Sequence, residues 1–179
     1  MKATGIVRRI DDLGRVVIPK EIRRTMRIRE GDPLEIYTTR EGEVIFKKYS
    51  LIGGLEDFAA QFCDVLNRSS GFTAAVTDRD AIIAITGSGK RELLGKPLSD
   101  ALAQVLEQRS IYQYQGSGRP LPVSDSSDRS TVAGAAPILC EGDVLGLVLF
   151  LSSDAQIPGE GEYKLAQTVS AFLGRHMET

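Results

Sequence analysis

The pattern of hydrophobic and polar positions changes several times within the first fifty residues. Short β-branched or alternating runs between turn residues predict strands, whereas residues 19–27 have a helical period. Ile22 and Met26 stand four positions apart there, with basic residues on the other faces. Pro19 suits the start of this helix, because its ring presets φ and the residue before it favours an extended backbone. The expected strands cover residues 4–10, 15–18, 34–38 and 44–49.

The pattern becomes more strongly amphipathic after Gly53 and Gly54, which we take as the boundary between two domains, 1–53 and 54–179. In the second domain helical periods alternate with apolar hairpins, which is typical of the α+β class. Ser99 is the expected N-cap of the second helix. The expected helices are 55–66, 100–109 and 160–177, the hairpins 72–86 and 131–151, and the loops 117–120 and 124–127.

Charge is distributed unevenly along a chain of otherwise ordinary composition. The 179 residues are 42% hydrophobic and 26% charged, which is normal for a globular protein. Residues 1–50 hold 12 Lys and Arg against 8 Asp and Glu, and the remainder holds 10 against 16. The formal net charge of -2 therefore conceals a basic N-terminal segment, residues 1–50, and an acidic remainder. This arrangement suits binding of a polyanion by the N-terminal segment.

Neither membrane nor disulfide signals are prominent in the sequence. The first residues lack the apolar core of a signal peptide, and the longest strongly apolar run, 144–151, is far short of the roughly 18 residues that cross a bilayer. Two cysteines, Cys63 and Cys140, make no disulfide framework in a chain of this length. We expect a cytoplasmic, nucleoid-associated protein without a membrane partner.

The first fifty residues contain too little secondary structure to form a stable core alone. A short helix and four short strands bury little apolar surface, so a partner is needed. A homodimer with interleaved hairpins would pair the strand edges and place two copies of each arginine on one surface. We therefore expect self-association through this domain.

Three segments carry a family resemblance: Lys-Ala-Thr-Gly-Ile-Val-Arg-Arg at 2–9, Asp-Leu-Gly-Arg-Val-Val-Ile-Pro at 12–19, and Glu-Ile-Arg-Arg-Thr at 21–25. Together they resemble the swapped-hairpin DNA-binding domain of AbrB-type transition-state regulators. The resemblance implies an intertwined dimer that binds double-stranded DNA through basic side chains of strands, loops and helix ends. The family's DNA-contacting arginines fall on Arg8, Arg15, Arg23 and Arg24.

The chemistry of these arginines is consistent with that role. A guanidinium group offers forked donors to phosphate oxygens or guanine edges, and each neutralised phosphate releases counterions. The alternative is that they are solvated charges, some of them paired with Asp11, Asp12 or Glu21. Without a helix-turn-helix or finger pattern, selectivity is expected to come largely from DNA shape. Second-tier candidates for general electrostatic contacts are Lys2, Arg9, Lys20 and Arg27.

The segment 135–149, two apolar strands joined by Glu-Gly and followed by a last helix, resembles a GAF domain. This implies a sensory domain with a pocket under its sheet and helical ends that dimerise. No cofactor is expected, and the residues that would bind a small-molecule effector cannot be named. The flanking helices present apolar stripes that can pack on another subunit, and if the two domains dimerise with different partners the assembly is a homotetramer. With both resemblances combined, the whole chain is similar to transcription regulators of endospore-forming bacteria. Such a regulator would act as an activator, a repressor or both.

Two alternative functions stay open at this point. One is an antitoxin that neutralises a partner, although antitoxins of the same fold usually continue into a disordered tail, and here a large domain follows. The other is a thiol-dependent GAF enzyme using Cys63 or Cys140. Residues 86–90 only superficially resemble a phosphate loop, because Ala84 and Arg91 stand where that motif needs Gly and Ser or Thr. We expect no enzyme, no catalytic residue and no metal site.

Overall fold

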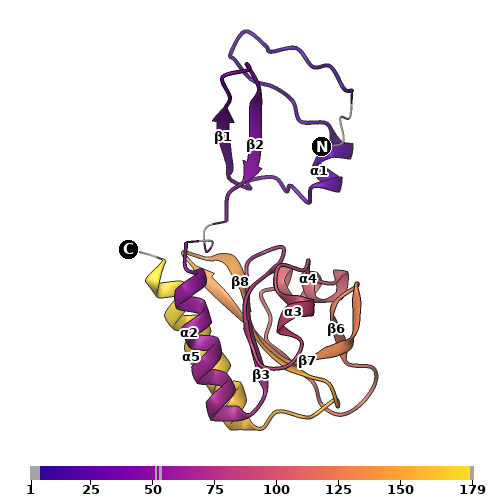
Figure 1. Cartoon of the computed structure of the whole chain (residues 1–179), viewed down its shortest axis with the longest axis vertical. Helices are drawn as coiled ribbons and strands as arrows, with labels where there is room; N and C mark the ends of the chain where they lie inside the picture. The colour runs from indigo at the N-terminus through magenta and orange to yellow at the C-terminus, as the bar shows by residue number, and fades with distance from the viewer. Residues whose placement is uncertain (1–4, 51, 53, 178–179) are drawn as a thin grey trace. The chain divides into compact units, whose positions relative to one another are not determined.

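The computed structural model describes residues 5–50, 52 and 54–177 and divides the chain into two units, Met1–Tyr49 (unit 1) and Ser50–Thr179 (unit 2), shown in Figure 1. Unit 1 contains helix α1, Lys20–Thr25, and the strands β1, Leu34–Thr38, and β2, Val44–Lys48. The two strands form an antiparallel hairpin in which Leu34 lies opposite Lys48. The helix and this hairpin confirm the sequence expectation.

The two strands predicted before α1 are not formed in the described part of 5–18, so this prediction is wrong for the single chain. Thr4, the first residue of the predicted range, lies outside the described residues. The turn itself is present, because the amide of Asp11 donates to the carbonyl oxygen of Arg15 at 3.1 Å. A strand needs a neighbouring strand for its N–H and C=O groups, and beyond the turn the two arms do not pair with each other.

Unit 1 has almost no buried side chains. Among its described residues, 5–49, Pro19 alone is buried. Val7 is 89% exposed and Val17 72% exposed, values that are extreme for β-branched residues. The apolar residues that lie exposed before α1 are Ile6, Val7, Ile10, Leu13, Val16 and Val17.

Unit 2 is an α+β domain built on a six-stranded antiparallel sheet, which confirms the predicted fold class. The strand order is β4-β3-β8-β7-β5, and β6 also pairs with β7. Its strands are β3 Thr73–Thr77, β4 Ile82–Thr86, β5 Tyr112–Gln113, β6 Leu121–Ser124, β7 Ser127–Cys140 and β8 Asp143–Ser152. Its helices are α2 Glu56–Ser70, α3 Lys90–Leu93, α4 Asp100–Glu107 and α5 Glu160–His176.

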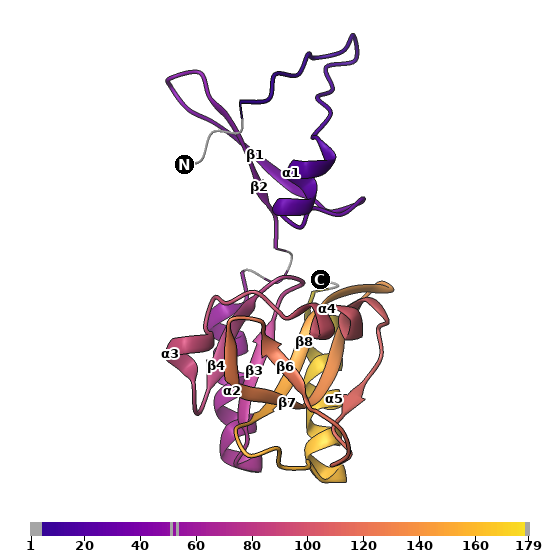
Figure 2. The same ribbon diagram turned by 90° about the vertical axis from the view of Figure 1, so that its right-hand side faces the viewer.

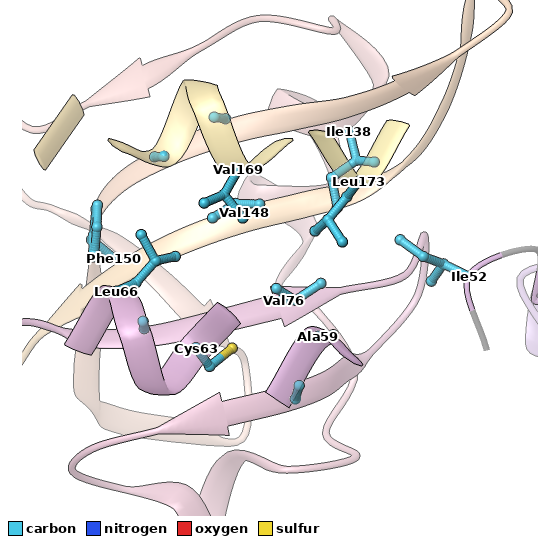
Figure 3. Close-up of a cluster of buried hydrophobic side chains, with 14 of the residues drawn as sticks. Ile52, Ala59, Cys63, Leu66, Val76, Ile138, Val148, Phe150, Val169 and Leu173 are labelled. Atoms are coloured by element: carbon cyan, nitrogen blue, oxygen red, sulfur yellow. The ribbon is translucent and has the colours of Figure 1, made fainter. Parts of the chain in front are cut away.

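Helices α2 and α5 lie side by side on one face of the sheet (Figures 1 and 2). Figure 3 shows Cys63 and Leu66 of α2 facing Val148 and Phe150 of β8, within one buried apolar cluster. Small residues on the inner face let α5 approach closely. At Gly174 a Cβ atom would collide with the carbonyl oxygen of Leu139, so only glycine fits there.

The opposite face of the sheet is covered by α3 and α4. Leu93 of α3 and Leu102 of α4 pack in a second buried cluster with Leu147 and Leu149 of β8. Successive side chains of β8 point to opposite faces of the sheet, so its residues belong alternately to the two buried clusters. Ser99 caps α4 as predicted, because its hydroxyl accepts the amide of Leu102 at 3.1 Å.

Three short elements, α3, β5 and β6, are not anticipated by the sequence pattern. The predicted loop 124–127 is a two-residue turn between β6 and β7, so β7 begins at Ser127, before the expected residue 131. Elements of two to four residues are too short to show a period, and pairing with β7 decides two of them. In the part of the chain that the structure describes, no helix is long and apolar enough to cross a membrane.

Candidate nucleic-acid interface

The four arginines expected to contact DNA lie on two segments of unit 1. Arg8 and Arg15 lie in the arms on either side of the turn, and Arg23 and Arg24 are adjacent on α1. All four are exposed. The single chain therefore presents two pairs of solvent-accessible guanidinium groups on a unit with a surplus of positive charge.

Asp11 fixes both the turn and the direction of Arg15. One carboxylate oxygen accepts the amides of Leu13 and Arg15 at 3.1 and 2.7 Å, and the other accepts Nε of Arg15 at 2.8 Å. These hydrogen bonds, first that of the Arg15 amide and then that of its side chain, hold the pKa of Asp11 below its ordinary value. The alternative that some arginines pair with nearby acids thus holds for Arg15, yet its side chain remains 69% exposed.

Helix α1 presents Arg23 and Arg24 in its last turn, where positive charge suits the negative end of the helix dipole. The helix ends in a Schellman motif, because the amide of Ile28 donates to the Arg23 carbonyl at 2.8 Å and that of Arg27 to the Arg24 carbonyl at 3.2 Å. Arg27 occupies the left-handed position of this motif with φ 51°. The carbonyl groups of Arg23 and Arg24 are thus satisfied by the backbone, and both arginine side chains are exposed to solvent.

The end of α1 is tied to the hairpin. Lys48 Nζ of β2 donates to the Arg27 carbonyl at 2.9 Å and lies 3.8 Å from a carboxylate oxygen of Asp32. The same Asp32 oxygen accepts the amide of Arg29 at 2.8 Å. This network fixes the angle between α1 and β2, so the helix arginines extend from a defined scaffold.

The second-tier cations have different positions. Arg9 and Lys20 are exposed, as expected for general electrostatic contacts. Arg27 is half-buried beside the Lys48 network, a position that sequence spacing does not reveal. Lys2 lies outside the described residues.

Two polar or reactive side chains of unit 2, Thr77 and Cys63, are buried in its interior. Thr77 is buried, and its hydroxyl accepts the amide of Leu147 at 3.1 Å. Cys63 is buried on α2, and burial raises the pKa of its thiol to about 12. Among the described residues, no group of three His, Cys, Asp or Glu side chains gathers as metal ligands would.

An aromatic cluster spans the outer side of α2 and α5. Phe58 and Phe62 make an edge-to-face contact with ring centroids 5.1 Å apart, and Phe172 lies 5.4 Å from Phe62. His176 stacks on Phe58 at 5.0 Å. Phe172 is 49% exposed, and Val65 on α2 is 58% exposed. The two helices therefore present an apolar surface to solvent.

Two family models match the chain in the regions of its two units. The model described as "Stage V sporulation protein T C-terminal, transcription factor" matches residues 54–178. The model described as "Antidote-toxin recognition MazE, bacterial antitoxin" matches residues 7–51.

Individual relatives match either the whole chain or about a quarter of it. Stage V sporulation protein T of Bacillus subtilis (strain 168) is 49% identical over 178 residues, which are 99% of each chain. The transition state regulatory protein AbrB of the same organism is 63% identical over 49 residues, 27% of this chain and 50% of AbrB. The solved N-terminal DNA recognition domain of AbrB covers 27% of this chain and 91% of its own, with a TM-score of 0.24.

A solved GAF domain resembles unit 2 in fold. It comes from a phosphoenolpyruvate-protein phosphotransferase of Coxiella burnetii, is 15% identical, and covers 68% of this chain and 80% of its own with a TM-score of 0.50. At this identity the likeness concerns the fold alone.

Proposed function

The chain belongs to the family of stage V sporulation protein T, a family of transcription regulators, and on this premise we propose that unit 1 binds double-stranded DNA while unit 2 modulates that binding. Its targets in this proposal are sporulation genes, which it activates, represses or both, in the cytoplasm at the nucleoid. The exposure of the four arginines together with the apolar residues before α1 is the observation that carries the proposal.

The exposed apolar arms imply a second copy of unit 1. Residues 5–18 carry unpaired backbone and exposed residues such as Val7 and Val17, which a partner's arms would pair and cover. The turn at Asp11 is already formed, so two copies need only exchange their arms. In the resulting homodimer every arginine is present twice.

Electrostatics favours a polyanion as the partner of this dimer. Residues 1–50 carry 12 cationic against 8 anionic side chains, while the rest of the chain has an acidic surplus. Arg8, Arg15, Arg23 and Arg24 offer forked donors to phosphates, and pairs related by two-fold symmetry can follow a groove. A six-residue α1 is too short to act as a long recognition helix, which favours reading of DNA shape.

The aromatic surface of α2 and α5 supports a second self-association. Phe58, Phe172 and Val65 on this surface suit packing against the same helices of another subunit. If unit 1 and unit 2 pair with different partner subunits, the full assembly is a homotetramer. A small effector bound to unit 2 could shift the placement of the DNA-binding dimers if it prefers one arrangement.

The antitoxin match over residues 7–51 favours one second candidate, a protein that neutralises a toxin. The segment after it is a folded unit matched by a different family over 54–178 rather than a free tail. Co-purification of a small partner protein with the full chain would support the antitoxin candidate. A thiol enzyme is disfavoured, because burial holds the Cys63 thiol protonated.

DNA binding by Arg23→Ala and Arg15→Ala variants tests the proposal. Each substitution removes two guanidinium groups from a dimer, so the slope of log affinity against log salt should decrease by about 1.8 if each group contacts one phosphate. The ratio of the DNA affinity of the unsubstituted protein to that of the variant should then fall about tenfold when the salt concentration is raised from about 50 to about 200 mM. Fluorescence anisotropy with labelled duplex DNA measures both quantities.

The matched control is Arg68→Ala, which removes an exposed arginine from α2 of unit 2. It should change neither the slope nor the affinity appreciably. Light scattering verifies that each variant keeps its oligomeric state. Unchanged affinity in both unit 1 variants, with assembly intact, would contradict the proposed interface.

A further inference from the structure

A cleft of about 560 Å³ opens at one end of the sheet in unit 2. It lies where β4 and β8 end and β7 begins, because its lining includes Gly87 after β4, Ser153 after β8, and Arg129 and Ser130 on β7. Its volume is in the range of clefts that bind small molecules. The cleft lies outside the two buried clusters, which fill both faces of the sheet with apolar side chains.

The lining of the cleft is cationic within an acidic unit. Lys90, Arg91 and Arg129 contribute three positive charges, and Glu92 contributes one negative charge. Residues 51–179 as a whole carry 10 Lys and Arg against 16 Asp and Glu. A local positive surplus in a concave site concentrates anions, and here it runs against the charge of the surrounding domain.

The loop that forms one wall is held in a single conformation by β3. Gly87 has φ 118°, and a Cβ atom there would collide with Thr73. The Thr73 hydroxyl also accepts the amide of Ser88 at 2.8 Å. Because the loop is fixed before any ligand arrives, little ordering entropy opposes binding at this wall.

Arg129 is oriented across the cleft by Glu92. Its Nη1 donates to Oε1 of Glu92 at 3.2 Å, and the two side chains are 82% and 51% exposed. An ion pair this exposed is weak, so an anion in the cleft can displace the carboxylate. Glu92 therefore both aims the guanidinium group and competes with a ligand for it.

We propose that this cleft binds a small phosphorylated metabolite, with the phosphate held by Arg129 and Lys90 and the remaining part of the ligand resting among Gly87, Ser130 and Ser153. A compact dianion matches the net charge of the lining, and a forked guanidinium with an ammonium group is suited to phosphate oxygens. The concave shape favours a small molecule over duplex DNA. The inference rests on the proposed modulating role of unit 2 and gives the effector a chemical class.

The test is calorimetric titration of the full chain, without DNA, with glycerol 3-phosphate, inorganic phosphate and unphosphorylated glycerol at equal ionic strength. Saturable binding is expected for the phosphate monoester, weaker binding for inorganic phosphate, and none for glycerol. Arg129→Gln and Lys90→Gln should each weaken binding about tenfold, the loss of one charge-assisted contact, and Glu92→Gln should strengthen it.

Matched controls remove the same charges elsewhere in unit 2. Arg68→Gln and Lys164→Gln alter exposed cations of the ion pairs on α2 and α5 and should leave the titration unchanged. Thermal unfolding without phosphate verifies that each variant is folded.

Three results would overturn the proposal: no saturable binding of either phosphate, equal loss in the control variants, or binding of inorganic phosphate without binding of the monoester. A fourth is a loss of DNA affinity in Arg129→Gln without phosphate, which would assign the cleft to DNA. Since the titration contains no DNA, failure of the cleft leaves the arginine interface standing, and failure of the interface leaves the cleft standing.

Discussion

The thiol of Cys63 should be about a thousandfold less reactive in the folded protein than in the unfolded chain. Its side chain is buried on the inner face of α2 (Figure 3), and burial raises its pKa from an ordinary 9.0 to about 12. At pH 8 a thiol with the ordinary pKa is about one-tenth thiolate, whereas one with the raised pKa is about one ten-thousandth thiolate. Because burial also blocks access of the reagent, a thousandfold suppression is the minimum expected.

Alkylation by iodoacetamide, followed by mass spectrometry, measures this effect. A Cys140→Ser variant isolates Cys63, and the same variant in concentrated urea supplies the unfolded rate. In the folded protein the rate should keep rising with pH above 9, since the thiol does not finish ionising there. Stability should fall over the same range, because above pH 9 the unfolded state releases a proton that the folded state retains.

A folded rate within tenfold of the unfolded rate would refute this reasoning and would reopen the thiol-enzyme alternative. The converse variant, Cys63→Ser, reports on Cys140 at the β7–β8 turn, which is half-buried. A faster reaction at Cys140 than at Cys63 in the folded chain is the internal control. It shows that the reagent reaches a thiol of unit 2 while the domain remains intact.

Three further predictions concern packing and charge. Thr77→Val keeps the side-chain shape but leaves the buried amide of Leu147 without its acceptor. The free energy of unfolding in a urea titration should fall by about 1–3 kcal/mol. An unchanged free energy would show that this hydrogen bond contributes nothing to stability. Gly174→Ala forces α5 away from the Leu139 carbonyl and should lower the free energy of unfolding by about 1–3 kcal/mol in the same titration. An unchanged free energy would mean that α5 does not lie this close to Leu139. Asp11→Asn keeps an oxygen acceptor for the turn amides while removing a negative charge from the proposed interface. DNA affinity measured by fluorescence anisotropy should therefore rise about threefold. Weaker binding would show that the charged carboxylate is needed.

The elements predicted correctly are those in which a local signal and the final environment agree. The helix 100–109 begins after Ser99, whose hydroxyl caps it, and the long hairpin turns at Glu141 and Gly142 with φ values of 49° and 89°. The helix expected at 55–66 is present as α2, which buries Ala59, Cys63 and Leu66. In each case the residue types that favour the element locally are also the ones that the core buries.

The failures occur where a partner segment decides the structure. The residues before α1 have a strand pattern, yet one chain provides no strand for them, so only the turn at Asp11 forms. Strands β5 and β6 are short, and pairing with β7 creates them. The cleft is also invisible in sequence, because Lys90 and Arg129 are thirty-nine positions apart by their numbers and meet only at the end of the sheet.

The sequence by itself determined the α+β class, the uneven distribution of charge and the positions of most helices and hairpins, because these depend on local residue types and their spacing. The four arginines were singled out by the family resemblance, and their contact with DNA stays a prediction. Only the tertiary structure decided that Lys48 ties the end of α1 to β2, that both faces of the unit 2 sheet are filled, and that cations from distant segments line one cleft. Such features depend on contacts between segments far apart in the chain, and the period of a single segment carries no record of its neighbour.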